Sequence, residues 1–444
     1  MSKPTVRAAF AAVTTLFFAW GFITSLIDPL VAAVKGIFTL SNVEAQLSAF
    51  AFFIAYGLVS FPAAMLIGRL RAVPAILLAL TMMAFACLIM LGAANLAVYP
   101  LVLLGLFVLA SGITILQVAA NPLAAALGDP KGSHFRLTLS QTFNSFGTFI
   151  GPLIGAALFL EGVEVKEGAA ITPEVRDAAL AGIDRAYFWI CGLILLLLAF
   201  FWLSRRTIVA AAPPPRVLGK GMGALIGEAL TSRWALIGGA AIFLYVGAEV
   251  AIGTQMALLL NSDAVWGGSD AAFGVPLLGQ AMGSDGVPGV SLQEAGKAVA
   301  FYWGGAMVGR AAGSVLLARF SAARLLALFT AAASAMCLYV VAVGGVSAGF
   351  VALAIGLFNS IMFPVIFTLT LERSSASVEA TSGLLCTAIV GGAFIPLLVG
   401  ALSDQAGYVT ALIAPAACYA LLCLFAIAAG RVSILGHADA PTIH

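Results

Sequence analysis

Two acidic residues lie inside long apolar runs of this sequence, where a charged side chain is costly. Asp28 is the one charged residue of the stretch 8–34, and Glu249 lies inside the apolar run 234–260. A carboxylate at the centre of a membrane helix costs roughly 2.5–3.5 kcal/mol on insertion scales, so it usually faces a cavity or a partner and serves function. We expect Asp28 to bind a proton or a substrate. The alternative is an aspartate near the helix end, just before Pro29, that reaches headgroup water.

Polar side chains also recur at helical spacing inside the apolar runs. Trp20, Thr24 and Asp28 lie four residues apart, so they share one face of a helix. Amides offer donors and acceptors to a neutral polyol, and indole or phenol rings offer a flat face to a sugar. The alternative is hydrogen bonding between helices, worth about 0.6–2 kcal/mol per contact. Further stripes are Thr114, Gln117 and Asn121; Gln141, Asn144, Ser145 and Thr148; Tyr245 and Glu249; and Tyr302, Trp303 and Arg310.

The elements that must position these side chains are apolar helices. About 20 apolar residues of helix cross a bilayer, and we count twelve such runs. The composition agrees, since 62% of the residues are hydrophobic and 9% are charged, whereas a soluble domain has about 25% charged residues. An all-α membrane protein is expected. The twelve spans are 8–34, 46–68, 73–95, 98–127, 137–160, 186–204, 234–260, 295–317, 323–344, 346–371, 380–402 and 408–430.

The two halves of the chain repeat each other, which predicts a parallel duplication. Gln117 lies five residues before Pro122, and Asn359 lies five residues before Pro364. A duplicated transporter-like fold places its substrate site at the repeat interface, near the middle of the membrane. Glycines at 147, 151 and 155 and at 305, 309 and 313 predict close helix packing. The predicted domains are an N-terminal six-helix bundle, 1–204, a proline-containing cytoplasmic linker, 205–233, and a C-terminal six-helix bundle, 234–444.

The distribution of basic residues predicts the orientation. An even number of spans places both termini on one side, and basic residues collect on the cytoplasmic side. Most of the 21 basic residues fall in the termini and in alternate loops. The opposite loops contain Lys35, Lys166, Arg176, Arg185 and Lys297. Both termini are therefore expected in the cytoplasm, and the net charge of +2 suggests no nucleic-acid partner.

Five stretches make the chain similar to a known family. It resembles the fucose–proton symporter family of the major facilitator superfamily, and within that family most closely its glucose/galactose transporter branch. The similarity covers nearly the whole chain, and the NSFG and GLFNSIMFP blocks are its most specific parts. The stretches are HFRLTLSQTFNSFGTFIGPLIG (134–155), ILQVAANPL (115–123), YVGAEVAIG (245–253), YWGGAMVGR (302–310) and GLFNSIMFP (356–364).

The resemblance implies two six-helix bundles that rock about a sugar held between them, in a bacterial inner membrane. It implies that Asp28 couples a cation to transport and binds sugar, and that Gln141 and Asn144 line the sugar site. The fucose symporter has a second carboxylate where this chain has Gln117, so Glu249 is expected to take part of that role. The expected substrate contacts are Asp28, Gln117, Asn121, Gln141, Asn144, Glu249, Trp303 and Asn359.

The leading hypothesis is a hexose importer driven by protons and functional as a monomer, with no cofactor and no enzymatic activity. Sodium coupling is the first alternative, because carboxylate and amide oxygens also suit a hard cation. A drug or amphiphile exporter would have a mainly apolar cavity. Outside the class of transporters, the alternatives are a membrane-embedded enzyme and a sugar sensor. Arg310 has two expected roles, pairing with backbone carbonyls or an acid at the cytoplasmic gate, or snorkelling to the interface.

Overall fold

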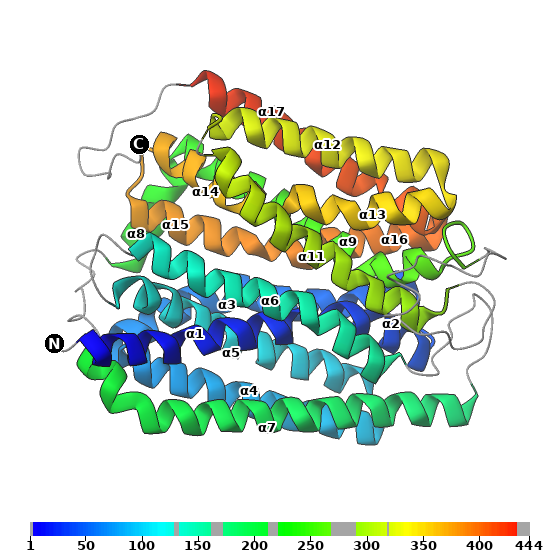
Figure 1. Cartoon of the computed structure of the whole chain (residues 1–444), viewed down its shortest axis with the longest axis horizontal. Helices are drawn as coiled ribbons and strands as arrows, with labels where there is room; N and C mark the ends of the chain where they lie inside the picture. Colours follow the sequence, from blue (N-terminus) through cyan, green and yellow to red (C-terminus); the bar gives the residue numbers. More distant parts are fainter. Residues whose placement is uncertain are drawn as a thin grey trace.

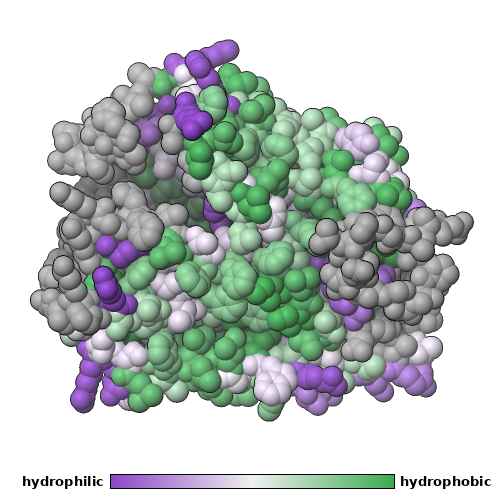
Figure 2. Space-filling view, viewed as in Figure 1, coloured by the Kyte–Doolittle hydropathy of each residue, from purple (hydrophilic) through white to green (hydrophobic). Residues whose placement is uncertain are grey.

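The computed structural model describes residues 3–127, 133–160, 172–211, 221–267, 290–317 and 319–432. Long helices run side by side through the molecule (Figure 1). In the space-filling view an apolar belt covers the middle of the helices, and hydrophilic residues gather toward the two ends (Figure 2). We call the end where α1 begins the terminal end and the opposite end the distal end.

The first bundle contains α1 to α7, which occupy the lower part of Figure 1. Pro29 separates α1 from α2 because proline lacks an N–H and its ring clashes with the carbonyl four residues earlier, that of Ser25. A turn at Leu26 interrupts the helix at that point. The helices are α1 (Lys3–Ser25), α2 (Ile27–Ile37), α3 (Asn42–Leu70), α4 (Ala72–Leu96), α5 (Tyr99–Ala126), α6 (Ser133–Phe159) and α7 (Pro173–Ala211).

The second bundle contains α9 and α11 to α17. Pro364 likewise follows a break, at Ser360 and Ile361, between two helices. The helices are α9 (Arg233–Asn261), α11 (Leu292–Leu317), α12 (Ala322–Val343), α13 (Gly345–Asn359), α14 (Met362–Arg373), α15 (Val378–Thr387), η2 (Ala388–Val390), α16 (Gly391–Ala411) and α17 (Ile413–Arg431).

Each of the twelve expected spans corresponds to a helix or to helices in direct succession. Eleven stretches of the described chain are long and apolar enough to cross a membrane. The twelfth, α11, has the length of 26 residues but contains Lys297 and Arg310, which lower its mean hydropathy. The largest difference between a predicted span and the observed helix is at α7, which begins at Pro173 rather than at the predicted residue 186. Proline at the first helical position and Glu174 in the first turn are both favourable helix starts.

The predicted linker, 205–233, is helical over most of its described part. Residues 205–211 continue α7, and a short helix, α8 (Met222–Thr231), follows. The three prolines lie in 212–220, outside the described residues. Glu228 of α8 accepts a hydrogen bond from the backbone N–H of Ser377, 2.6 Å away, at the start of α15. The linker therefore ends in a helix that is attached to the second bundle.

The glycine rows pack helices closely, as predicted. A Cβ built on Gly147 would meet the backbone of Phe18 and Phe22 in α1, and one on Gly155 would lie 2.6 Å from Pro29. In the second bundle, a Cβ on Gly305 would lie 3.1 Å from the backbone nitrogen of Leu357. These glycines let α6 approach α1 and α2, and let α11 approach α13.

The two bundles are joined at the distal end by residues of α16. Asp404 accepts hydrogen bonds from the backbone N–H groups of Asn42 (2.7 Å) and Val43 (2.9 Å) at the start of α3. Tyr408 donates to the Asn42 side chain at 2.6 Å and accepts from Lys35 of α2. We call these five residues the distal latch. Gly407, with a φ of 81°, allows the chain to turn between Asp404 and Tyr408.

Candidate functional site

Asp28 lies in the first turn of α2, directly after the helix break, and is 3% exposed. Its Oδ2 accepts a hydrogen bond from the indole N–H of Trp303, 2.6 Å away on α11. This bond joins the first bundle to the second. The alternative of a carboxylate that reaches headgroup water is therefore wrong for this conformation, because the side chain is covered by the second bundle.

Glu249 lies on α9 and is half-buried. Its Oε1 accepts a hydrogen bond from the Tyr245 hydroxyl at 2.7 Å, one helical turn earlier. Its backbone carbonyl accepts from the hydroxyl of Tyr302 at 3.1 Å. Its charge acts on Asp28, so the two carboxylates repel each other across the bundle interface. A proton or another cation on either of them would relieve that repulsion.

Amides of the first bundle form a second polar group. Gln117 of α5 donates to the hydroxyl of Tyr56 on α3 at 3.0 Å. Gln141 of α6 donates to the side-chain oxygen of Asn121 on α5 at 3.4 Å. The three amide side chains are half-buried, so part of each remains accessible. Tyr56 was not among the expected site residues; its signal in the sequence is a phenol inside the apolar run 46–68.

The polar side chains on α6 between Gln141 and Thr148 form hydrogen bonds with more than one neighbouring helix. Asn144 donates to the backbone carbonyl of Phe17 on α1 at 3.1 Å, and a Cβ on Gly21 would lie 2.6 Å from its Nδ2. Ser145 instead accepts from Arg310 of α11. The expectation that these side chains face one way is wrong, because Asn144 and Ser145 are adjacent in the sequence and point about 100° apart around the helix, so they reach different neighbouring helices. Asn144 bonds to α1 in this conformation.

Arg310 bridges the bundles. Its Nη1 donates to the Ser145 hydroxyl at 2.7 Å, and its Nε lies 3.5 Å from the backbone carbonyl of Ser360. Pro364 cannot donate to that carbonyl, which leaves it available. Of the two expected roles, pairing with a backbone carbonyl agrees with the structure, and the side chain is held by protein groups rather than directed to the membrane surface.

Gln117 and Asn359, which occupy matching positions in the two halves of the sequence, differ in their structural surroundings. Gln117 is half-buried, whereas Asn359 is 0% exposed and donates to the Tyr302 hydroxyl at 2.7 Å. The helix of Gln117, α5, continues to Ala126, while the helix of Asn359 ends at that residue. Asn359 therefore supports Tyr302 in this conformation, and a sugar would contact it only after a rearrangement.

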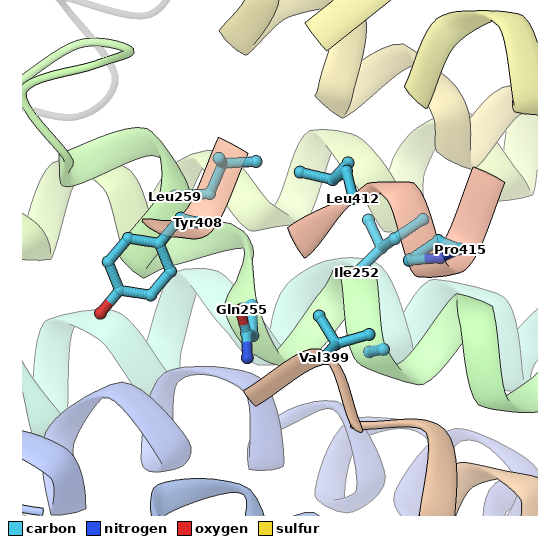
Figure 3. Close-up of a pocket in the computed structure, with 8 residues that line it drawn as sticks. Ile252, Gln255, Leu259, Val399, Tyr408, Leu412 and Pro415 are labelled. Atoms are coloured by element: carbon cyan, nitrogen blue, oxygen red, sulfur yellow. The ribbon is translucent and has the colours of Figure 1, made fainter. Parts of the chain in front are cut away.

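Two hollows of the described chain lie apart from these carboxylates. One, of about 10 Å³, is lined by Gln255, Tyr408 and apolar side chains (Figure 3). It has room for about one water molecule and none for a sugar. The other, of about 550 Å³, is an apolar groove between α6, α11 and α13 that includes Phe149 and Phe301. Within the described residues, no group of three His, Cys, Asp or Glu side chains could hold a metal ion.

The arrangement suits a carrier. Asp28 of the first bundle is bonded to Trp303 of the second, and Glu249 of the second bundle interacts with Asp28, so a change in charge there alters how the bundles fit. Such sites near the middle of the membrane, beside interrupted helices, are typical of secondary transporters. The hydrogen bonds of Asp28 and Arg310 both cross the interface, so opening it would break them.

Comparison with known proteins agrees with this interpretation. The pattern of the Major Facilitator Superfamily matches residues 9–385. The chain is 38% identical to the glucose/galactose transporter of Brucella abortus biovar 1 (strain 9-941), over 94% of this chain and 93% of that protein. It is 29% identical to the L-fucose-proton symporter of Escherichia coli (strain K12), over 94% and 92% of the two chains.

The fold agrees as well. The crystal structure of the fucose transporter in the outward conformation matches with a TM-score of 0.67 and 27% identity, over 96% of this chain and 100% of that one. These relatives are transporters and not enzymes. The chain therefore belongs to the major facilitator superfamily, with twelve transmembrane helices in two pseudo-symmetric bundles.

Proposed function

We propose that this protein imports a hexose of the glucose/galactose type by proton symport with alternating access. The observation that carries the proposal is Asp28, a covered carboxylate at a helix break on the bundle interface, bonded to Trp303 of the other bundle. Relatives named glucose/galactose transporter and L-fucose-proton symporter support the sugar and the coupled cation. The protein acts as a monomer in the bacterial inner membrane, with both termini in the cytoplasm.

Glu249 and the half-buried amides are the proposed sugar contacts. A carboxylate accepts two hydrogen bonds from adjacent sugar hydroxyls, and such charge-assisted bonds are stronger than those of an amide. Gln117, Asn121 and Gln141 supply both donors and acceptors from the first bundle. Trp303, Asn144 and Asn359 join the site in conformations in which their present bonds open.

Asp28 is the proposed coupling acid. Protonation removes its charge, which allows the loaded carrier to change conformation. The membrane potential then supplies roughly 2.3 kcal/mol per charge per 100 mV. Asp28→Asn should abolish accumulation against a gradient while it retains sugar exchange, because an amide is nearly isosteric with a protonated carboxyl but does not titrate.

The test is uptake of labelled glucose, galactose and fucose into proteoliposomes, with an imposed proton or sodium gradient. Accumulation driven by the proton gradient supports the proposal. Accumulation driven only by sodium would replace the proton with sodium as the coupled ion. Accumulation by Asp28→Asn equal to that of the unmodified protein would remove Asp28 from the mechanism. Absence of sugar uptake together with transport of amphiphiles would favour an exporter, and sugar binding without transport would favour a sensor.

A further inference from the structure

The carboxylate of Glu249 is held by a tyrosine of its own helix. Tyr245 lies one turn earlier on α9 and is 2% exposed. Its hydroxyl donates to Glu249 Oε1 at 2.7 Å and also lies 3.2 Å from the backbone carbonyl oxygen of Asn359 on α13. A hydrogen bond to a carboxylate is charge-assisted and roughly twice as strong as one between neutral groups. The phenol therefore restricts the direction in which the long side chain of Glu249 points.

Two further residues support this arrangement from neighbouring helices. Tyr302 of α11 is fully buried and donates to the backbone carbonyl of Glu249 at 3.1 Å. The side chain of Asn359 donates to the Tyr302 hydroxyl at 2.7 Å, and its backbone carbonyl accepts from Tyr245. Asn359 thus contacts both tyrosines that bind Glu249, one through its side chain and one through its backbone.

Close packing fixes α9 at the same height. Gly247 lies between Tyr245 and Glu249 in the sequence. A Cβ on this glycine would lie 2.7 Å from the Cβ of Ile395 and 2.9 Å from the backbone carbonyl oxygen of Gly391, both on α16. The two helices therefore approach so closely that no side chain fits between them. Glu249 extends from a fixed backbone, and a rigid element holds a binding group more precisely than a loop does.

The nearby charges pull the Glu249 carboxylate in different directions. Arg310 of α11 attracts it, and Asp28 of the first bundle repels it. Tyr245 is bonded to Oε1, and among the described residues no hydrogen bond reaches Oε2. Since Glu249 is half-buried, Oε2 can accept from a ligand. Without the Tyr245 bond, the attraction of Arg310 would turn the carboxylate away from its present direction.

We propose that Tyr245 is a positioning residue that fixes the Glu249 carboxylate, so that the protein selects sugars by the hydroxyl that Glu249 binds. The inference rests on the proposed sugar contact of Glu249. A site built to hydrogen-bond a particular substrate hydroxyl discriminates strongly against an analogue that lacks it. That discrimination requires an acceptor with one direction, and a carboxylate free to turn toward Arg310 loses it. Tyr245 acts through Glu249 and has no contact with the sugar.

The test uses the monodeoxy derivatives of glucose, each of which lacks one hydroxyl. Their inhibition of labelled-glucose exchange in proteoliposomes gives an affinity for each derivative, and the loss relative to glucose is the penalty for that hydroxyl. The hydroxyl that Glu249 binds should cost the unmodified protein about 10- to 100-fold, as for a hydrogen bond to a charged group. In Glu249→Gln the penalty for the same hydroxyl should fall to about 2- to 10-fold, as for a neutral bond.

Tyr245→Phe keeps the ring and removes the O–H group. It should reduce the penalty for the hydroxyl that Glu249→Gln identifies by about fivefold, since the carboxylate no longer has a fixed direction. The penalties for the other hydroxyls should change less than about twofold. In a Glu249→Ala background, Tyr245→Phe should leave every penalty within about twofold, because the two residues act as one pair.

Tyr339→Phe is the matched control. It removes a hydroxyl that lies 3.1 Å from the hydroxyl of Ser347, on an exposed part of α12 in the same bundle. It should leave all penalties unchanged. If Tyr245→Phe does not fold, Tyr302→Phe decides, because it releases the backbone carbonyl of Glu249 and the side chain of Asn359. It should reduce the penalty for the same hydroxyl.

The outcomes separate this inference from the proposed function. Penalties in Tyr245→Phe equal to those of the unmodified protein would overturn the role of Tyr245 and leave hexose transport intact. An equal loss of affinity for glucose and every derivative would also overturn it, because that is the effect of a general change in structure. If Glu249→Gln alters no penalty, Glu249 is not the sugar contact and the inference is wrong with it. If the unmodified protein exchanges no hexose, the proposed function itself is wrong, and so is the role of Tyr245 in it.

Discussion

The distal latch predicts how readily the distal end of the carrier opens. Asp404 of α16 accepts from the first two backbone N–H groups of α3 in the other bundle, those of Asn42 and Val43. These groups have no partner within their own helix. The N-terminal end of a helix also carries partial positive charge, which a carboxylate complements. Opening the distal end must break this contact, so its strength contributes to the balance between closed and open forms.

Asp404→Asn removes the charge and one acceptor, and it leaves an amide N–H₂ opposed to a backbone N–H. Interaction of a carboxylate with a helix N-terminus is worth about 0.3–1 kcal/mol when exposed and up to about 2 kcal/mol when partly buried. Asp404 is exposed, so we expect a loss of about 0.3–1 kcal/mol. That corresponds to a decrease of about 2- to 5-fold in the ratio of closed to open distal ends.

Spin labels at Leu96→Cys and Val343→Cys, exposed positions at the distal ends of α4 and α12, measure this ratio by pulsed electron paramagnetic resonance in a background without the six native cysteines. Asp184→Asn is the matched control, because Asp184 accepts from the side chain of Asn95 at 2.8 Å within the first bundle. The control should leave the distances between the bundles unchanged. Equal distance distributions for Asp404→Asn and the unmodified protein would refute the latch. A similar shift in Asp184→Asn would mean that loss of any acidic group at this end has the effect.

Three further substitutions test the site. Glu249→Gln should weaken sugar binding strongly while residual transport stays dependent on the ion gradient; normal binding with lost gradient dependence would exchange the roles of Glu249 and Asp28. Gln141→Ala should weaken sugar binding by about 1–3 kcal/mol, since a desolvated hydroxyl loses its partner, and calorimetry with an unchanged affinity would contradict this. Asn144→Ala should weaken binding similarly, and it should also lower the melting temperature because the bond to Phe17 is lost. A melting temperature equal to that of the unmodified protein would show that this bond adds no stability.

The orientation and the boundaries of the domains stay predictions. The described basic residues Arg71, Arg205 and Arg319 lie at the terminal end, and Lys35 and Lys297 lie toward the distal end. This is the distribution from which a cytoplasmic terminal end is expected. Labelling of single cysteines from either side of the membrane would test it.

The helices and their approximate bounds were predictable because membrane insertion depends on local composition. A run of about 20 apolar residues spans the hydrocarbon core whatever its neighbours are. The glycine rows also act locally, since their spacing places them on one face of a helix. The break before Asp28 follows from Pro29, the next residue. Asp28 and Glu249 could be selected as site residues because a charge inside an apolar run is expensive in any fold.

The partners of those residues were decided by tertiary structure. Trp303 and Asp28 are 275 positions apart, and Asp404 and Asn42 are 362 apart. Helical periodicity gives the side of a helix on which a residue lies, but not which helix faces that side or at what height. Those depend on how the two bundles dock. For the same reason Asn359 became buried beneath Tyr302 while Gln117, its counterpart in the repeat, kept an accessible amide.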